Sequence, residues 1–282
     1  MQVILGFIVV FASVLGGYVM ATGKVMALWQ PPEFVIILGA AVGAMVIANP
    51  SSVLKNILTR LKMTLGKGYG DDYFKSVLQL MYELLEIVRK DGLKKLDDHI
   101  ENPERSEIFA RYPQIANSSV MLPFITDNLR MIAMGKMSHY DLEAAFELEL
   151  EALESDLMRP SKAVAKTGEA MPGFGIVAAV LGIVVTMQNI GGSLTLIGVK
   201  VAAALVGTFF GVLMAYGVFD PLASSIASMV KKEMMALRMI STILVAQAQG
   251  KPTILALDAG RRLLYSEYKP TFSEMEEWMV RD

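Results

Sequence analysis

The 282-residue sequence contains no cysteine and only two histidines. The absence of cysteine excludes disulfides, thiolate metal sites and cysteine nucleophiles. His99 and His139 are 40 residues apart, which is not the spacing of a metal-ligand pair, and no nucleophile–base set or phosphate-binding loop is readable. The net charge of −2 gives no basic excess for binding nucleic acid. We therefore expect no enzyme, no cofactor, no metal site and no nucleic-acid partner.

Charge is missing from two long stretches, residues 172–190 and 201–219, which are 19 residues each. A helix of that length spans about 28 Å, close to the hydrocarbon thickness of a bilayer. Residues 3–21 and 34–49 are also uncharged, and residues 22–33 between them are expected to be a loop. The chain is 54% hydrophobic but still 19% charged. This composition predicts an all-α membrane protein with four transmembrane helices and a sizeable aqueous part.

The four predicted spans contain no titratable residue near the middle of the membrane. A path for protons or cations across a bilayer usually needs such a group. If this chain conducts protons, the carboxylate must come from a partner.

Each of the last two spans carries a stripe of small residues at helical spacing. The first stripe is Gly175, Ala179, Gly182 and Thr186, and the second is Ala204, Thr208, Gly211 and Ala215. Small residues allow close helix approach in lipid. Two interpretations stay open at this point: ordinary packing within the bundle, or a surface that lines a pathway or receives a guest helix.

Basic residues are concentrated on one side of the predicted spans, after the second, before the third and after the fourth. The positive-inside rule then places both termini and the segment 51–171 in the cytoplasm. We expect four regions: spans one and two (1–50), a helical cytoplasmic domain (51–171), spans three and four (172–220), and a cytoplasmic extension with a tail (221–282). The tail after residue 268 is acidic and is expected to be poorly ordered.

Within the cytoplasmic domain, apolar periodicity predicts helices over 72–90 and 93–101, the second ended by Asn102-Pro103. A further apolar-periodic stretch covers 115–134. Ser138 and Asp141 have the spacing of a capping box for a long helix that ends near residue 158. Its glutamates are typical of a solvated face.

Five motifs stand out: MPGFGIVAAVLGIV and LVGTFFGVLMAYGVFDPLA in the last two spans, IENPERSEIF and SVMLPFI in the cytoplasmic domain, and GRRLLYSEYKPTFSEMEE near the end. Together with the four spans, these motifs resemble the MotA family of flagellar motor stator proteins. The related ExbB and TolQ energisers share the last two spans but lack the IENPERSEIF segment. An ExbB-like energiser of an envelope partner and a membrane scaffold without ion flow are the alternative functions.

The resemblance implies a pentamer of this chain, embedded in inner-membrane lipid, around the transmembrane helices of a MotB dimer. An aspartate of MotB carries the ion, and ion flow drives the rotor protein FliG. The small stripes would then form the wall that faces the MotB helices.

The resemblance also implies roles for individual residues. Torque coupling is expected at Pro172 and Pro221, and Thr208 matches the pore threonine of the family. The charges that match the rotor-facing set are Arg89, Lys90, Asp97 and Asp98. As alternatives, Pro172 is a simple first-turn proline, Pro221 only kinks a helix, and the charges are ordinary solvated side chains. The role of Asp220, which precedes Pro221, is open.

The expected coupling ion is the proton. Sodium-driven relatives carry a threonine at the position of Ala179, opposite the threonine that matches Thr208. With alanine at that position, one hydroxyl of the pair is missing, and a single hydroxyl per subunit is a sparse ligand set for sodium.

Overall fold

The computed structural model describes residues 2–66, 68–135, 137–188, 191 and 193–280. Every regular element within these ranges is a helix, so the predicted all-α class is confirmed. Four helical segments are long and apolar enough to cross a membrane, and they lie in Gln2–Met20, Pro31–Ala48, His139–Met187 and Ile197–Ala248. The chain contacts divide into two units, which we describe separately. The membrane unit lies within residues 1–68 and 157–229, and the head unit within residues 69–156 and 230–282.

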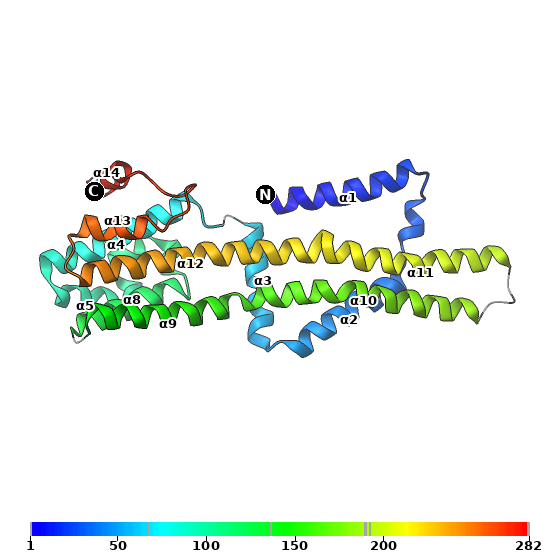
Figure 1. Cartoon of the computed structure of the whole chain (residues 1–282), viewed down its shortest axis with the longest axis horizontal. Helices are drawn as coiled ribbons and strands as arrows, with labels where there is room; N and C mark the ends of the chain where they lie inside the picture. The colour runs from blue at the N-terminus through cyan, green and yellow to red at the C-terminus, as the bar shows by residue number, and fades with distance from the viewer. Residues whose placement is uncertain (1, 67, 136, 189–190, 192, 281–282) are drawn as a thin grey trace. The chain divides into compact units, whose positions relative to one another are not determined.

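The membrane unit is built around two helices that lie side by side, α10 (Arg159–Met187) and α11 (Leu194–Met214) (Figure 1). Helix α2 (Pro31–Ala48) packs along α10. The remaining elements are α1 (Gln2–Met20), the short η1 (Val25–Leu28), α3 (Ser51–Leu65), the π-helical turn η3 (Ala215–Phe219) and the start of α12 (Asp220–Ala248).

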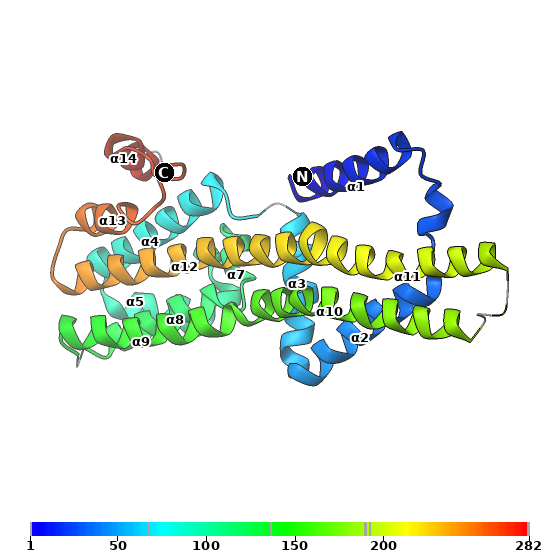
Figure 2. The same ribbon diagram turned by 45° about the vertical axis from the view of Figure 1, so that its right-hand side comes forward.

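Helix α1 has no buried residue and stands apart from α10 and α11 in both views (Figure 2). Its sequence is apolar on all sides, so its surroundings must be lipid or another protein chain. Two apolar clusters hold the other helices of this unit together. One joins α2, α10 and η3 through Ala41, Met171 and Ala215. The other joins α3, α10 and α12, and consists of Val53, Ile57, Ala163, Val164, Ala223 and Ile226.

The head unit is a cluster of shorter helices around the end of α12. These are α4 (Asp71–Asp91), α5 (Leu93–Glu101), η2 (Pro103–Arg105), α6 (Glu107–Ala110), α7 (Pro113–Ala116), α8 (Met121–Ala133), α9 (His139–Leu157), α13 (Thr253–Arg261) and α14 (Phe272–Val280). Its core is filled by four fully buried aromatic rings from α4, α6, α8 and α9, namely Phe74, Phe109, Phe124 and Phe146.

The amphipathic pattern of α4 packs as its spacing predicts, with Val77, Leu80, Met81 and Leu84 all fully buried. Gly92 separates α4 from α5 with a φ of +80°. A side chain with a Cβ is strained in that conformation, so glycine permits the sharp change of direction. The capping box at α9 also forms, because the Ser138 hydroxyl accepts from the Asp141 amide at 3.2 Å and donates to its carboxylate at 2.7 Å.

The described part of the C-terminal tail, up to Val280, is not irregular as expected but forms helix α14. Thr271 and Glu274 build a reciprocal capping box at its start. The Thr271 amide donates to the Glu274 carboxylate at 2.7 Å, and the Glu274 amide donates to the Thr271 hydroxyl at 3.2 Å. Met275 and Met279 are buried. The T-x-x-E signal was present in the sequence, but the net acidity of the segment concealed it.

A cluster of charged side chains at the end of α13 bonds to the segment that leads into α14. Asp258 accepts from Arg261 at 2.6 Å and from Arg262 at 2.8 Å, and Arg261 also donates to the Pro270 carbonyl at 2.7 Å. Burial acts to raise the pKa of Asp258, but the hydrogen bonds from Arg262 and Arg261 outweigh it and hold this pKa below the ordinary value of 3.8.

Replacing Asp258 with asparagine should therefore destabilise the chain by about 1–3 kcal/mol near neutral pH, because Arg261 is left buried without its carboxylate. A carboxyl whose folded-state pKa is lowered stabilises the protein above its unfolded pKa and loses that contribution as the pH falls. The deficit of D258N relative to wild type should shrink as the pH falls below 3.8. Thermal unfolding of the full chain in detergent, once near neutral pH and once below pH 3.8, measures this deficit. A deficit of the same size at the two pH values would contradict the assigned charge pairing.

Candidate functional site

Helices α10 and α11 meet along a seam made of glycine and alanine. A Cβ placed on Gly175 would lie 2.9 Å from the Gly207 carbonyl oxygen, and one placed on Gly211 would lie 2.6 Å from the Met171 carbonyl oxygen. Farther along the seam, Gly182 approaches Ala204 in the same way. Only residues without a side chain allow this backbone separation, so the small stripes bring the two helices into direct contact.

The seam separates the predicted stripe residues into two groups. Gly175, Gly182 and Thr186 lie in the seam itself, where the Thr186 hydroxyl donates to the Gly182 carbonyl at 2.8 Å. Ala179 and Thr208 are half-buried. We define these two residues as the seam edge. A role facing a partner helix stays a prediction for all five. Gly175 and Thr186 are buried, whereas Gly182 is half-buried like the seam edge.

Gly211 is the tightest point of the seam, and replacing it with alanine should push the two helices apart. We expect a loss of about 1–3 kcal/mol, the usual cost of forcing an extra carbon into a packed contact. Gly198 lies on the same helix, and a Cβ placed on it would meet nothing within 4 Å. Thermal unfolding in detergent should show a lower midpoint for Gly211→Ala and little change for Gly198→Ala. Equal midpoints would contradict the tight seam.

The two prolines interrupt the hydrogen bonding of adjacent helices. Pro172 lies inside α10, so the alternative of a first-turn proline is excluded. Pro221 is the second residue of α12 and lies two residues after the end of the π-helical turn η3. A proline cannot donate to the carbonyl four residues earlier, which leaves the carbonyls of Gly168 and Gly217 without that donor. A π-helical turn commonly accommodates such an interruption.

Gly168 lies at the contact between the segments of α10 and η3 in which the two prolines interrupt hydrogen bonding. A Cβ on Gly168 would lie 2.8 Å from the Phe219 Cβ and 3.7 Å from the Asp220 amide nitrogen. The carbonyl freed by Pro172 therefore belongs to a residue that touches the π-helical turn before Pro221. The Ser161 hydroxyl, farther along α10, donates to the Ala223 carbonyl at 2.8 Å and holds the same pair of helices. Asp220 itself is exposed.

Helix α2 contains a buried carboxylate that the sequence analysis placed in a loop. The helix begins at Pro31, because the two prolines have the backbone angle of a first turn and no amide donor to leave unpaired, and Glu33 is its third residue. Glu33 is 7% exposed, and its Oε2 has no hydrogen-bond partner. The expected loop 22–33 was therefore too long at its end, since the second span starts at Pro31 rather than Phe34 and includes a titratable residue in its first turn. The P-P-E pattern at a helix start was the signal that could have shown it.

The head unit presents the predicted rotor-facing charges on α4 and α5. Arg89 donates to the Glu86 carboxylate through two nitrogens, at 2.8 and 2.6 Å, and Lys90 pairs with the same carboxylate at 3.4 Å. The hydrogen bond from Arg89 lowers the pKa of Glu86, with a smaller contribution from the Thr253 hydroxyl at 3.0 Å. Asp97 and Asp98 are both exposed on α5. The sequence analysis did not identify Glu86 as the partner of Arg89.

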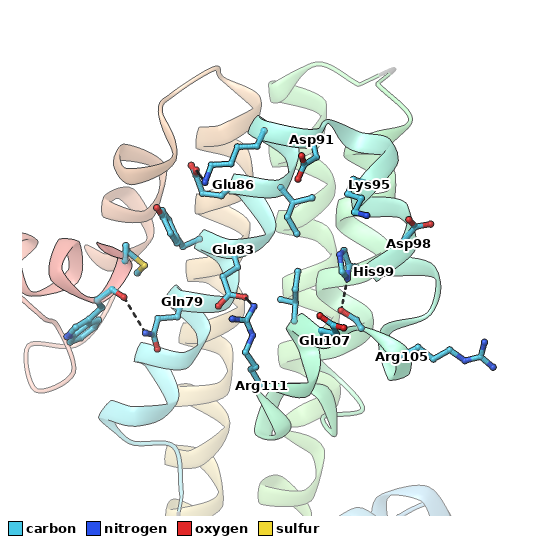
Figure 3. Close-up of a pocket in the computed structure, with 17 residues that line it drawn as sticks. Gln79, Glu83, Glu86, Asp91, Lys95, Asp98, His99, Arg105, Glu107 and Arg111 are labelled. Carbon is cyan, nitrogen blue, oxygen red and sulfur yellow. Dashed lines mark hydrogen bonds and ion pairs between the residues drawn. The ribbon is translucent and has the colours of Figure 1, made fainter. Parts of the chain in front are cut away.

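A polar pocket of about 960 Å³ lies beside these charges, between α4, α5, α6 and α14 (Figure 3). Lys90 and Asp98 line it, whereas Arg89 and Asp97 do not. Inside it, Glu83 pairs with Arg111 and accepts from Tyr112 at 2.7 Å, and His99 bonds to Ser106 at 2.9 Å. In the part of the chain that the structure describes, no group of three potential metal ligands occurs.

Comparison with known proteins assigns this chain to a family. The family described as "Motility protein A N-terminal" matches residues 4–92, and the "MotA/TolQ/ExbB proton channel family" matches residues 116–239. The chain is 47% identical over 281 residues to "Chemotaxis protein LafT" of Vibrio parahaemolyticus, covering 99% of each chain. The chain belongs to the MotA family. It is also 38% identical to "Motility protein A" of Escherichia coli, over 98% of this chain and 94% of that protein.

Solved structures of MotA family complexes have the same fold. "Structure of C. jejuni MotAB" gives a TM-score of 0.75 at 19% identity and covers 94% of this chain and 96% of that chain. "Structure of the flagellar MotAB stator complex from Bacillus subtilis" gives 0.72 at 19% identity and covers 95% and 98%. The expected resemblance to flagellar stator proteins is therefore confirmed.

Proposed function

We propose that this chain is the subunit of a flagellar stator that conducts protons together with a MotB-type partner and turns the rotor. The observation that carries the proposal is family membership, from two family matches over residues 4–92 and 116–239 and from a relative that matches 99% of the chain. The N-terminal match is to motility proteins, which favours a flagellar role over an energiser of the ExbB or TolQ kind. A multi-pass position in the bacterial inner membrane follows from the four apolar helices and the family.

The partner supplies the proton-carrying carboxylate in this proposal. The seam edge, Ala179 and Thr208, offers a methyl group and one hydroxyl but no titratable side chain. A proton crossing beside it needs a carboxylate from elsewhere. The names of the two similar structures describe complexes of MotA with MotB, which supports a MotB helix as its source.

In a pentamer around two MotB helices, lipid or neighbouring copies would cover the surfaces of the membrane unit that are unpacked within one chain. Helix α1 buries nothing within one chain, so lipid and neighbouring copies are its expected surroundings. Gly39 and Gly43 on α2 also have nothing within 4 Å of their Cβ positions, which leaves this G-x-x-x-G pair available to a neighbouring copy. The basic residues after α2 and before Pro172 support cytoplasmic termini.

The proline pair is the proposed link between proton passage and movement. The carbonyls of Gly168 and Gly217 lack their usual donors at the point where α10 touches the π-helical turn. Unpaired carbonyls in lipid are unfavourable unless water, an ion or another donor satisfies them. A change in that donor would alter the local bend of both helices at once.

Proton uptake into vesicles tests this function. Vesicles that contain this chain with a MotB-type partner should acidify when a potential drives cations inward. Vesicles with this chain alone, or with a partner whose intramembrane aspartate is replaced by asparagine, should not. Equal uptake in all three preparations would refute a shared proton path.

Reversal of the charges proposed to face the rotor should impair swimming more than neutralisation. Exposed charge pairs act through complementary fields, which tolerate a single loss better than an inversion. Arg89→Glu also places a carboxylate beside Glu86, and Asp97→Lys places a second cation three residues from Lys94, so both variants are needed. Arg130→Glu is the matched control, because Arg130 is likewise paired, with Glu101 at 2.9 Å, and is partly exposed, but lies outside the proposed set. Membrane levels should be normal in all variants. Normal swimming of Arg89→Glu and Asp97→Lys together would contradict the role in rotor contact.

A further inference from the structure

The carboxyl group of Glu33 occupies a notch in the α10–α11 seam. A Cβ placed on Gly207 would lie 2.8 Å from Glu33 Oε2, and one placed on Gly182 would lie 3.3 Å from Glu33 Oε1. The two glycines come from opposite sides of the seam, so the carboxyl group touches both helices. Without a side chain at either position, the backbone forms the wall of the notch.

Among the described residues, none donates a hydrogen bond to Glu33 Oε2, and Glu33 is 7% exposed. As the third residue of α2, Glu33 could have folded back to accept from the Gln30 amide and cap its own helix. Its Oε2 instead has no hydrogen-bond partner and lies against Gly207. An isolated buried carboxylate is strongly unfavourable, and the group becomes neutral by taking up a proton.

The charged groups on the packed helices do not alter this conclusion. On α10, no titratable residue lies between Glu169 and the end of the helix at Met187. On α11, the titratable residue is Lys200, seven positions before Gly207 and thus about 10 Å along the helix. Among the ion pairs between described residues, none joins Lys200 to Glu33.

The connection between α1 and α2 brings exposed residues close to the notch. Pro31 and Pro32 are exposed, and Trp29 is 64% exposed immediately before this helix start. The carboxyl group is therefore about one helical turn from exposed residues, although its Oε2 is covered.

We propose that Glu33 is a proton-binding site of this chain, which holds a proton at neutral pH and exchanges it with water at the α1–α2 connection. The stator then contains a titratable group of its own in addition to the carboxylate of the partner. The neutral acid docks the start of α2 on the seam, and its loss of a proton would place a negative charge against two glycine backbones. Only the placement of this site in a proton-conducting complex rests on the proposed function.

Infrared spectroscopy tests the protonation state directly. The full chain, purified with its partner in lipid near neutral pH, should show the carbonyl stretch of a protonated carboxylic acid that disappears in Glu33→Gln. The contribution of the partner cancels in this difference. Glu169→Gln is the matched control, because Glu169 is exposed and pairs with Lys166 at 3.0 Å, so its removal should take away only an ionised carboxylate band. If Glu33→Gln likewise loses only an ionised band, Glu33 is charged and the proposal is overturned.

Two further spectra make the test independent of the folding of Glu33→Gln. Transfer of the wild-type complex into D₂O should shift the carbonyl band to lower frequency, and a band that does not shift would contradict exchange with water. Gly207→Ala keeps the glutamate but puts a methyl group 2.8 Å from Oε2. We expect the band to move in frequency in this variant, and an unchanged band would contradict the notch. None of these spectra requires rotation, so failure of the proposed motor function would leave the expected bands intact.

Discussion

Replacing Pro221 or Pro172 with alanine should stop flagellar rotation while the chain still inserts and assembles. Each substitution restores an amide that can bond to the carbonyl four residues earlier, of Gly217 or Gly168. The π-helical turn before Pro221 then loses its reason to form, and α12 can continue α11 as a regular helix. The contact between Gly168 and Phe219, which joins the two interruptions, would change with it.

The measurement is swimming speed together with the amount of complex recovered from the membrane. Pro50→Ala is the matched control, because Pro50 lies at the start of α3, where a missing amide has no partner to lose. We expect the control to swim at the wild-type speed and both test variants to be immotile at normal complex levels. A proline variant that swims normally would have a structural role only.

Swimming should stop in a protonophore at neutral pH and should hardly change when sodium is removed from the medium. A sodium path must replace part of the hydration shell of the ion with several oxygens. The seam edge offers a single hydroxyl, from Thr208, beside the methyl group of Ala179. A proton needs only the carboxylate of the partner and a chain of water.

The sodium experiment needs the proton gradient to be held constant, so that the effects of sodium and protons on swimming can be told apart. Cells are compared in potassium and sodium media at the same proton-motive force. A motor that stops in the potassium medium would show that sodium is the coupling ion. The variant Thr208→Ser, which retains the hydroxyl, controls for a loss of packing at the seam edge.

Local signals in the sequence predicted the head unit well. Helix α5 has the predicted bounds, since Gly92 starts it and Asn102-Pro103 ends it, and both act within a few residues. The buried face of α4 and the capping box of α9 also follow from spacing alone. Helix α14 was missed because overall acidity was given more weight than its capping box.

Contacts between distant segments were harder to predict. The small stripes were visible, but the sequence could not show that Gly175 and Gly211 would face one another across the seam. Glu33 was assigned to a loop because charge was used to mark the end of an apolar stretch. The structure shows that a carboxyl group inside a membrane helix is possible where a neighbouring helix provides glycine in place of side chains. The pairing of Arg89 with Glu86 was missed for a simpler reason, because an i, i+3 pair on an exposed face gives no signal beyond its charges.

Particle images of the complete complex in lipid test the central claim most directly. The account predicts five copies of this chain around two partner helices, with the seam edge of Ala179 and Thr208 facing those helices and α1 on the outside. The carboxylate of the partner should lie at the level of the seam, between α10 and α11 of neighbouring copies. Partner helices found against α1, or a ring with no helix at its centre, would contradict the account.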